Sequence, residues 1–382
     1  MKFSILKAVI PALAVFAVTG CDDWTTPEPK DFDSPLTEIL KDDAYYEALR
    51  AYKASDHSVS FGWFSEWGEG GVATNNMLQA VPDSMDIISL WNNSHLTPTK
   101  KADLDFVTKV KGTKVLICSF VPEVGCFYSP GELTTVQERR DYWGWKDGDE
   151  EAIHNSIIKW TKTIADSLNI YGFSGIDIDY EPGEYGGALC RNSQYFTWFV
   201  EEMGKYIGPQ SGTDKVFIVD GYYTSMPNAA ELVKYFDYFV NQAYATTSFV
   251  SPNTSNSANG LESRLRSTIY AFSGVMSEEE ITKKLIVTEN LESAIDCLNG
   301  GFWWYDIDGY RWDKKIMPSL VGFADWKPSN GFRKGGFGAY RFSNEKVNNP
   351  PYKWMRKAIQ QQNPAPGKQI IEKPADSIEN LN

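Results

Sequence analysis

The chain has 382 residues, of which 42% are hydrophobic and 14% aromatic, and its 37 basic and 50 acidic residues give a formal net charge of −13. This composition is typical of a globular protein with one large domain or two ordinary ones. No basic block interrupts the acidic surface, which would repel phosphate backbones and anionic lipid headgroups. Nucleic acid is therefore not expected as a partner.

The first residues have the pattern of a processing signal. Lys2 and Lys7 precede an apolar run over 8–18, which is too short to span a bilayer as a stable helix. A small residue and then Cys21 end the run, which resembles a bacterial lipobox, where the cysteine is lipidated and becomes the first residue. We therefore expect removal of residues 1–20 and an exported lipoprotein, tethered through Cys21 and facing outward on the outer membrane. An ordinary secretory signal with an incidental cysteine is the alternative.

The two ends of the mature chain differ in composition from its middle. Residues 21–45 are rich in Pro, Asp and Thr, which is typical of a flexible, solvated tether. Residues 363–382 are again polar and contain several prolines, so we expect a tail there. No linker or short repeat interrupts residues 46–362, which are predicted to form one domain and to act as a monomer.

Brief β-rich runs alternate with amphipathic helical stretches in this domain, the pattern of an α/β chain with a parallel sheet. Eight strands are predicted, at 58–64, 85–91, 114–121, 172–179, 215–220, 238–244, 284–289 and 336–342. Helices are predicted at 150–168, 192–207, 261–273 and 314–324. Spacing of about 36 residues per unit is that of a (β/α)8 TIM barrel. A doubly wound open sheet is the alternative, but no strand precedes a glycine-rich phosphate loop.

Cysteine and histidine are too scattered to indicate a metal site. Four cysteines follow Cys21 without CxxC pairs, and none of the three histidines is at ligand spacing. Neither a zinc site nor a triad of Cys or Ser with His is indicated. The sequence leaves open the disulfide state of Cys118, Cys126, Cys190 and Cys297.

The fourth predicted strand carries acidic residues with a period of two. Asp177, Asp179 and Glu181 share one face, and apolar residues occupy the other. On an inner barrel strand, these carboxylates lie in the interior and rise to its C-terminal rim. Anions at steps of about 6–7 Å in low dielectric cannot all ionise cheaply, so at least one should hold a proton near neutral pH. A rim carboxyl with a raised pKa suits a general acid. An acidic edge strand facing water is the alternative.

Residues 174–181, with the sequence S-G-I-D-I-D-Y-E, resemble the strand-four signature D-G-x-D-x-D-x-E of glycoside hydrolase family 18. Ser174 replaces the first aspartate. The resemblance implies a retaining reaction in which the substrate's own N-acetyl carbonyl attacks the anomeric carbon. It also implies that Glu181 protonates the leaving oxygen, that Asp179 orients the acetamido group and that Asp177 supports them. Neither a metal nor an organic cofactor is implied.

The family also carries a strand-six tyrosine in the pattern M-x-Y-D. Here Gln242 takes the methionine position, Tyr244 the tyrosine position and Ala245 the aspartate position. The resemblance implies that Tyr244 hydrogen-bonds the acetamido oxygen, with Gln242 in support, although a barrel-lining aromatic is the alternative for Tyr244. Tyr340 stands where the family has a strand-eight tryptophan. These departures weaken an assignment as a chitinase.

Beyond Glu181 the chain continues with P-G-E-Y-G, which is similar to the bacterial endo-β-N-acetylglucosaminidases of the endoglycosidase H and F type in this family. Those enzymes also pair a glutamine with the strand-six tyrosine. The likeness implies hydrolysis of the β-1,4 bond between the two core N-acetylglucosamines of an N-linked glycan or glycoprotein. The alternatives are a chitinase-type hydrolase of N-acetylglucosamine oligomers and a noncatalytic glycan-binding surface lipoprotein.

Several residues near strand ends are expected to bind substrate, because the C-terminal face of such a barrel carries the active site. They are Trp63, Asp220, Tyr222, Glu289 and Tyr340.

Overall fold

The computed structural model describes residues 41–70, 74–91, 96–246, 260–302, 304 and 318–364. The described residues from Asp43 onward form one compact unit. The predicted signal, the lipidation site Cys21 and most of the predicted tether and tail lie outside the described residues. In the parts of the chain that the structure describes, no helix is both long enough and apolar enough to cross a membrane.

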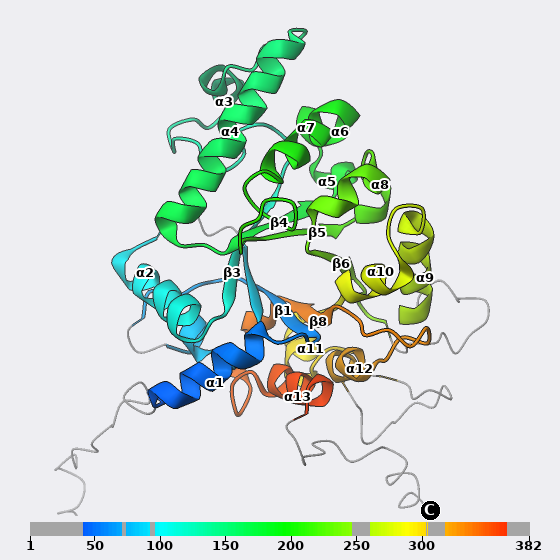
Figure 1. Ribbon diagram of the computed structural model, residues 1–382. Coiled ribbons are helices and arrows are strands. Elements are labelled where there is room, and N and C mark those ends of the chain that lie inside the picture. Colours follow the sequence, from blue (N-terminus) through cyan, green and yellow to red (C-terminus); the bar gives the residue numbers. More distant parts are fainter. Residues whose placement is uncertain are drawn as a thin grey trace, which may run out of the picture. The chain divides into compact units, whose positions relative to one another are not determined.

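Eight parallel strands close into one barrel, in which each strand pairs with the next and the last returns to the first (Figure 1). The strands are β1 (Val59–Phe64), β2 (Ile87–Trp91), β3 (Lys114–Phe120), β4 (Gly175–Tyr180), β5 (Val216–Gly221), β6 (Tyr238–Gln242), β7 (Leu285–Asn290) and β8 (Gly336–Tyr340). The predicted (β/α)8 barrel in a single domain is confirmed. The fourth strand begins later than predicted, because α4 runs on to Tyr171 and Gly172, with φ +85°, ends it.

Helices flank the barrel on its outside (Figure 1). They are α1 (Asp43–Ala54), α2 (Pro98–Asp105), α3 (Val136–Trp143), α4 (Glu150–Tyr171), α5 (Pro182–Tyr185), α6 (Ala188–Arg191), α7 (Ser193–Met203), α8 (Ala229–Leu232), α9 (Leu261–Phe272), α10 (Glu278–Lys284), α11 (Ala294–Asn299), α12 (Ser319–Asp325) and α13 (Lys353–Gln362).

Three of the four predicted helices agree with α4, α7 and α9 to within a few residues. Helix α7 begins one residue late, because Asn192 is its N-cap and accepts from two backbone amides. The fourth corresponds to α12, and residues 314–317 of that prediction lie outside the described residues. Helix α1 already begins at Asp43, within the predicted tether. The ends of the domain meet where Asn363 Nδ2 donates to the Tyr52 hydroxyl at 2.9 Å.

Strand alignment decides which side chains face the barrel interior. Asp177 is aligned with Cys118 of β3, and Asp179 with Asp220 of β5, so these four side chains share the inner face. Apolar side chains pack the interior beneath the acids: Val59, Phe61, Trp63, Ile87, Leu116, Cys118, Ile218, Val240 and Ile286. A packed floor of this kind leaves the C-terminal mouth as the place for chemistry.

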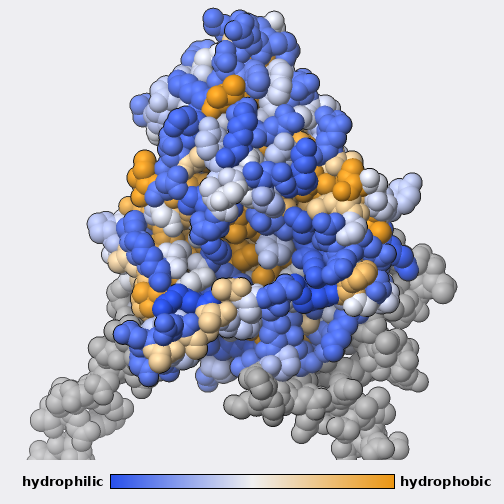
Figure 2. Space-filling model, in the orientation of Figure 1, coloured by the Kyte–Doolittle hydropathy of each residue, from blue (hydrophilic) through white to orange (hydrophobic). Residues whose placement is uncertain are grey.

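The outer faces of the strands are also buried, as expected for a parallel barrel under helices. Helix α4 contributes eight buried residues to the layer of helices, among them Trp160. The outward surface is different. Figure 2, in the same orientation, shows a face that is mostly hydrophilic and broken by scattered hydrophobic areas.

Candidate active site

The three acids of β4 form a column that climbs from the barrel floor to its mouth. Asp177 is fully buried and Asp179 is 6% exposed. Glu181 follows the last strand residue, where Pro182 begins the short helix α5, and it is half-buried. The period of two in the sequence is therefore the period of the pleat, and the acid at the rim is the one that substrate can reach.

Asp177 is held by donors from the first two strands. Its Oδ2 accepts from Trp63 Nε1 at 2.8 Å and from Ser89 Oγ at 2.7 Å. Burial nevertheless raises the pKa of Asp177 to about 6. Trp63 is only 2% exposed, so the structure gives it the place of a support for Asp177 instead of the substrate contact that was predicted.

Asp179 lies against Asp220 of β5, and both are buried. Burial, followed by the negative charge of Glu181, raises the pKa of Asp179 to about 8. Burial and the charges of Asp179 and Asp177 raise the pKa of Asp220 well above its ordinary value. The aspartates therefore form a cluster that shares its protons, because neighbouring carboxylates cannot all ionise in low dielectric.

The open oxygens show where a shared proton would sit. Gln242 Nε2 donates to Asp220 Oδ1 at 2.9 Å. Asp177 Oδ1, Asp179 Oδ1 and Asp220 Oδ2 are buried and have no hydrogen-bond partner among the described residues. A proton on Asp220 turns this carboxyl into a donor toward one of the other two aspartates.

Glu181 differs from the aspartates in facing the mouth. Burial raises its pKa and the charge of Glu184 adds to the rise, whereas a hydrogen bond with Gln242 lowers it. Gly221, at the end of β5 with φ +75°, lets the neighbouring loop approach both acids: a Cβ there would lie 3.2 Å from Asp179 Oδ1 and 3.2 Å from Glu181 Cγ. A raised pKa at the rim is the property a general acid requires.

Tyr244 lies beyond the end of β6, half-buried, with its ring centroid 6.2 Å from that of Tyr340. Burial and the charges of Asp220 and Asp179 raise its pKa well above the ordinary value. The hydroxyl therefore stays protonated at neutral pH and can donate a hydrogen bond. Tyr340 ends β8 on the inner face, and the structure thus brings Tyr244, Tyr340 and the acid column to one mouth.

An aromatic rim at this mouth was missed in the sequence. Phe120, the last residue of β3, stacks on Tyr185 of α5 with ring centroids 3.9 Å apart, and Trp91 of β2 lies 5.2 Å from Phe120 and 6.3 Å from Tyr340. Strand alignment could have placed Trp91 and Phe120 on the inner face, whereas nothing local predicts the stacking of Phe120 on Tyr185. Flat rings of this kind suit the apolar faces of sugars.

The prediction that Glu289 faces the mouth is wrong. Residues 288 and 290 align with inward positions of β8, so the pleat turns Glu289 to the outer face of β7. It is 2% exposed, and its carboxylate accepts from Ala245 N at 2.9 Å, from Asn290 N at 2.7 Å and from the Ser319 hydroxyl.

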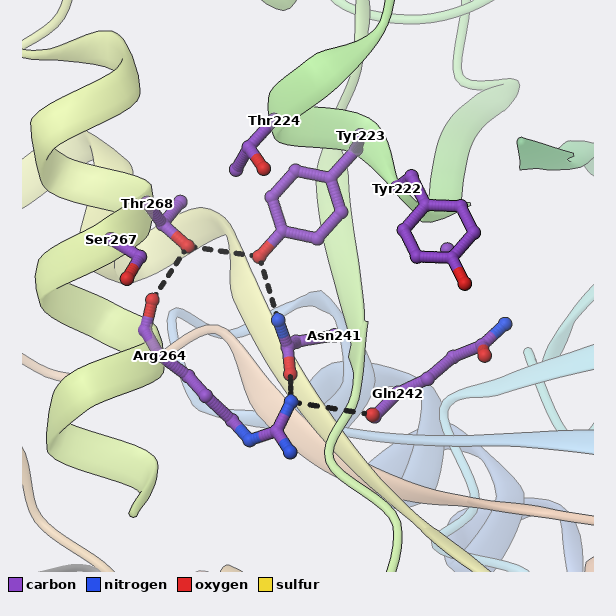
Figure 3. Close-up of a pocket in the computed structure, with 9 residues that line it drawn as sticks. Tyr222, Tyr223, Thr224, Asn241, Gln242, Arg264, Ser267 and Thr268 are labelled. Carbon is purple, nitrogen blue, oxygen red and sulfur yellow. Dashed lines mark hydrogen bonds between the residues drawn. The ribbon is translucent and has the colours of Figure 1, made fainter. Parts of the chain in front are cut away.

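Tyr222 is 55% exposed at the end of β5 and lines a cavity of about 370 Å³ (Figure 3). Gln242 and Arg264 also line this cavity, in which Figure 3 shows the Arg264 guanidinium directed at the backbone of Gln242. Asp220, by contrast, is fully buried and accepts a hydrogen bond from Gln242, so its place is in the acid cluster inside the barrel.

One group of described side chains could hold a metal ion: the ligand atoms of Cys118, Asp177 and Asp220 lie within 4.8 Å of one another. Burial raises the pKa of the Cys118 thiol well above its ordinary value, whereas a metal would need the thiolate. Trp63 and Gln242 already donate to this cluster. The donor set fits a shared proton better than a metal. All four described cysteines are free thiols.

Comparison with known proteins gives a family and several relatives. Residues 25–361 match the family described as glycoside hydrolase family 18, BT1044-like. Endo-beta-N-acetylglucosaminidase F2 of Elizabethkingia meningoseptica is 26% identical over 303 residues, which are 76% of this chain and 75% of the relative.

Solved structures extend the likeness. A structure of a selenomethionine-labelled variant of BT1044 is 26% identical, with a TM-score of 0.67 over 84% of this chain and 93% of that chain. The apo endo-β-N-acetylglucosaminidase from Cordyceps militaris is 18% identical, with a TM-score of 0.56 over 85% and 98%, and shares the fold. Because the family match spans most of the chain and includes the acid column, the protein belongs to glycoside hydrolase family 18, whose glycosidases include endo-β-N-acetylglucosaminidases.

Proposed function

We propose that this protein is a retaining, substrate-assisted endo-β-N-acetylglucosaminidase that hydrolyses the β-1,4 bond between the two core N-acetylglucosamines of N-linked glycans. The observation that carries the proposal is the acid column of β4, in which a rim glutamic acid stands above buried aspartates that share protons. The tyrosine hydroxyl of Tyr244 faces the same mouth. Each part matches a step of substrate-assisted hydrolysis.

In the first step, protonated Glu181 gives its proton to the leaving glycosidic oxygen. The acetamido carbonyl oxygen of the substrate attacks the anomeric carbon as that bond breaks, and an oxazolinium ring forms. Asp179 accepts a hydrogen bond from the acetamido N–H and balances the charge that develops there. Tyr244 donates to the acetamido oxygen and directs it toward the carbon.

In the second step, a water attacks the anomeric carbon from the face that the leaving group has vacated. Glu181, now ionised, takes the proton of this water, and the ring opens to restore the acetamido group. The two inversions give net retention. Asp177 and Asp220 take no part in bond making; they supply the shared proton that lets Asp179 change its charge during the cycle.

Several observations support an N-glycan as the substrate. The relative from Elizabethkingia meningoseptica is named as an endo-beta-N-acetylglucosaminidase and is similar over three quarters of its length. The rim rings of Trp91, Phe120 and Tyr185 offer stacking surfaces for sugars beyond the cleaved bond. An acidic protein surface also suits a neutral glycan better than an anionic polymer.

The test is mass spectrometry of a glycoprotein with defined high-mannose and biantennary complex N-glycans, before and after incubation with residues 41–364. We expect loss of each accepted glycan with one N-acetylglucosamine left on its asparagine. The Glu181→Gln variant is the matched control and should leave the glycoprotein intact. Cleavage of chitin oligomers instead would favour a chitinase, and binding without cleavage of either would favour a glycan-binding protein.

We also propose that the protein is exported and held on the outer membrane by a lipid on Cys21, with the barrel facing outward. The apolar run and the small residue before Cys21 support this proposal. Growth with labelled palmitate should label the wild type but not Cys21→Ala. Protease added to intact cells should remove the barrel, and protection of the barrel would contradict the outward orientation.

A further inference from the structure

The turn that carries Tyr244 has a conformation that needs support. Ala245, the next residue, has φ +56°, in the left-handed region that side-chain-bearing residues adopt only when surrounding contacts hold them. The turn begins at Gln242, whose side chain reaches Asp220, and Ala243 N donates to Thr288 O of β7 at 3.0 Å. The direction of Tyr244 therefore depends on what holds this turn.

Glu289 holds the turn from outside the barrel. Glu289 Oε1 accepts the Ala245 N–H at 2.9 Å and the Asn290 N–H at 2.7 Å, and Oε2 accepts the Ser319 hydroxyl of α12. The Phe302 N–H in turn donates to Ser319 Oγ at 2.8 Å. Burial raises the pKa of Glu289, and the hydrogen bonds from Ser319, Ala245 and Asn290 counter that rise. Glu289 thus joins the Tyr244 turn to the end of β7 and to α12.

A cation holds the same turn one step earlier (Figure 3). Arg264 of α9 donates through one terminal nitrogen to Gln242 O at 3.4 Å and to Asn241 Oδ1 at 3.0 Å. Asn241 Nδ2 donates to the Tyr223 hydroxyl at 3.2 Å, and that hydroxyl bonds to Thr268 at 2.9 Å. Burial lowers the pKa of Arg264, and the nearby Tyr223 and Glu289 counter part of that fall. Arg264 and Glu289 therefore flank one short segment, since they bond to Gln242 O and Ala245 N.

We propose that Glu289 and Arg264 form a hydrogen-bonded clamp on the outside of the barrel, which positions Gln242 and Tyr244 over the acid cluster. Both residues act on the backbone of this segment, so both are positioning residues. Only the kcat measurement in its test rests on the proposed function. The hydrogen bond to the Ala245 amide can be probed without substrate.

The test compares Glu289→Ala with Glu289→Gln. A glutamine carbonyl can still accept both backbone amides while its NH2 donates to Ser319 Oγ, whereas alanine removes every contact. We expect hydrogen exchange of the peptide over 240–246 to speed up in Glu289→Ala and to stay slow in Glu289→Gln. We also expect kcat to fall about 10- to 100-fold in Glu289→Ala, with KM little changed, and to recover in Glu289→Gln.

A double-mutant cycle separates positioning from simple support of the fold. If Glu289 acts through Tyr244, Glu289→Ala should cost far less in a Tyr244→Phe background. Glu345→Ala is the matched control, because Glu345 is also buried and accepts from two backbone amides, Trp354 N and Met355 N, with no described hydrogen bond to β6. It should lower stability and leave kcat unchanged.

Two results would overturn the clamp. One is unchanged hydrogen exchange over 240–246 in Glu289→Ala. The other is an equal loss of kcat in the presence and absence of the Tyr244 hydroxyl. A wild type that cleaves no N-glycan would count against the proposed function instead; the cycle would then be run on whichever N-acetylglucosamine oligomer is cut, and the exchange measurement would decide the clamp if none is cut.

Discussion

Asp179 and Glu289 are both buried carboxyl groups at the C-terminal ends of barrel strands, and they differ in the hydrogen-bond donors around their oxygens. Glu289 accepts from two backbone amides and a hydroxyl. Asp179 faces other carboxyl groups, and its buried Oδ1 has no partner among the described residues. A buried carboxylate whose oxygens all accept hydrogen bonds stabilises the fold. A buried carboxylate that lies among other carboxyl groups and has an oxygen without a donor can instead bind a proton or a ligand.

The largest expected effect lies at the rim of the open cluster. Glu181→Gln keeps the shape and the contact with Gln242 but removes the proton that the leaving oxygen needs. We expect kcat to fall about 100- to 10,000-fold, with glycan binding retained. Calorimetry of the variant with a biantennary glycan measures binding, and its turnover rate measures the loss of kcat. Full activity would show that another group is the acid.

Gly221 tests whether the close approach of β5 to the acids matters. Gly221→Ala would place a Cβ 2.8 Å from Tyr180 O at a φ of +75°. We expect a loss of about 1–3 kcal/mol in the free energy of unfolding. We also expect a kcat loss that exceeds that of Gly212→Ala. Gly212 has φ +71° but nothing within 4 Å of an added Cβ, and it provides the matched control.

Glu345, a buried carboxyl group that accepts backbone hydrogen bonds as Glu289 does, gives a test by pH. Burial raises its pKa to about 7 from 4.5, so the folded protein retains a proton that the unfolded chain has released between these values. Its stabilising contribution is full below pH 4.5, and about 3 kcal/mol is lost as the pH rises through about 7. Urea unfolding at pH 5 and pH 8 should show a smaller difference in Glu345→Gln than in the wild type. An equal difference would contradict this assignment.

The smallest effect concerns Glu184, whose negative charge helps to raise the pKa of Glu181. Glu184→Gln removes that charge, so Glu181 should lose its proton at a lower pH. The basic limb of the kcat/KM profile should then move to lower pH, whereas Glu279→Gln on α10 should not move it. A shift to higher pH would show that another group controls this limb.

The sequence predicted the barrel and the column well, because both depend on local alternation. A period of two over 174–181 was enough to align three acids, and eight alternating units were enough to predict closure. The same rule corrects the error at Glu289: Ile286 lies in the interior, so residues 288 and 290 also face inward and Glu289 faces outward.

Contacts between distant elements could not be predicted. Trp63 and Ser89 meet Asp177 only because the barrel closes, and Phe120 meets Tyr185 across a long stretch of chain. Short helices such as α10, which begins with a capping box at Ser277 and Glu280, were also missed, since they have too few turns for a clear apolar period.

The most direct test of the central claim is proton NMR of the first turnover on a defined N-glycan. Substrate-assisted hydrolysis by Glu181, Asp179 and Tyr244 predicts that the new reducing-end N-acetylglucosamine appears first as its β anomer and only later mutarotates to the α anomer. Initial release of the α anomer would contradict the double inversion that this arrangement of acids implies.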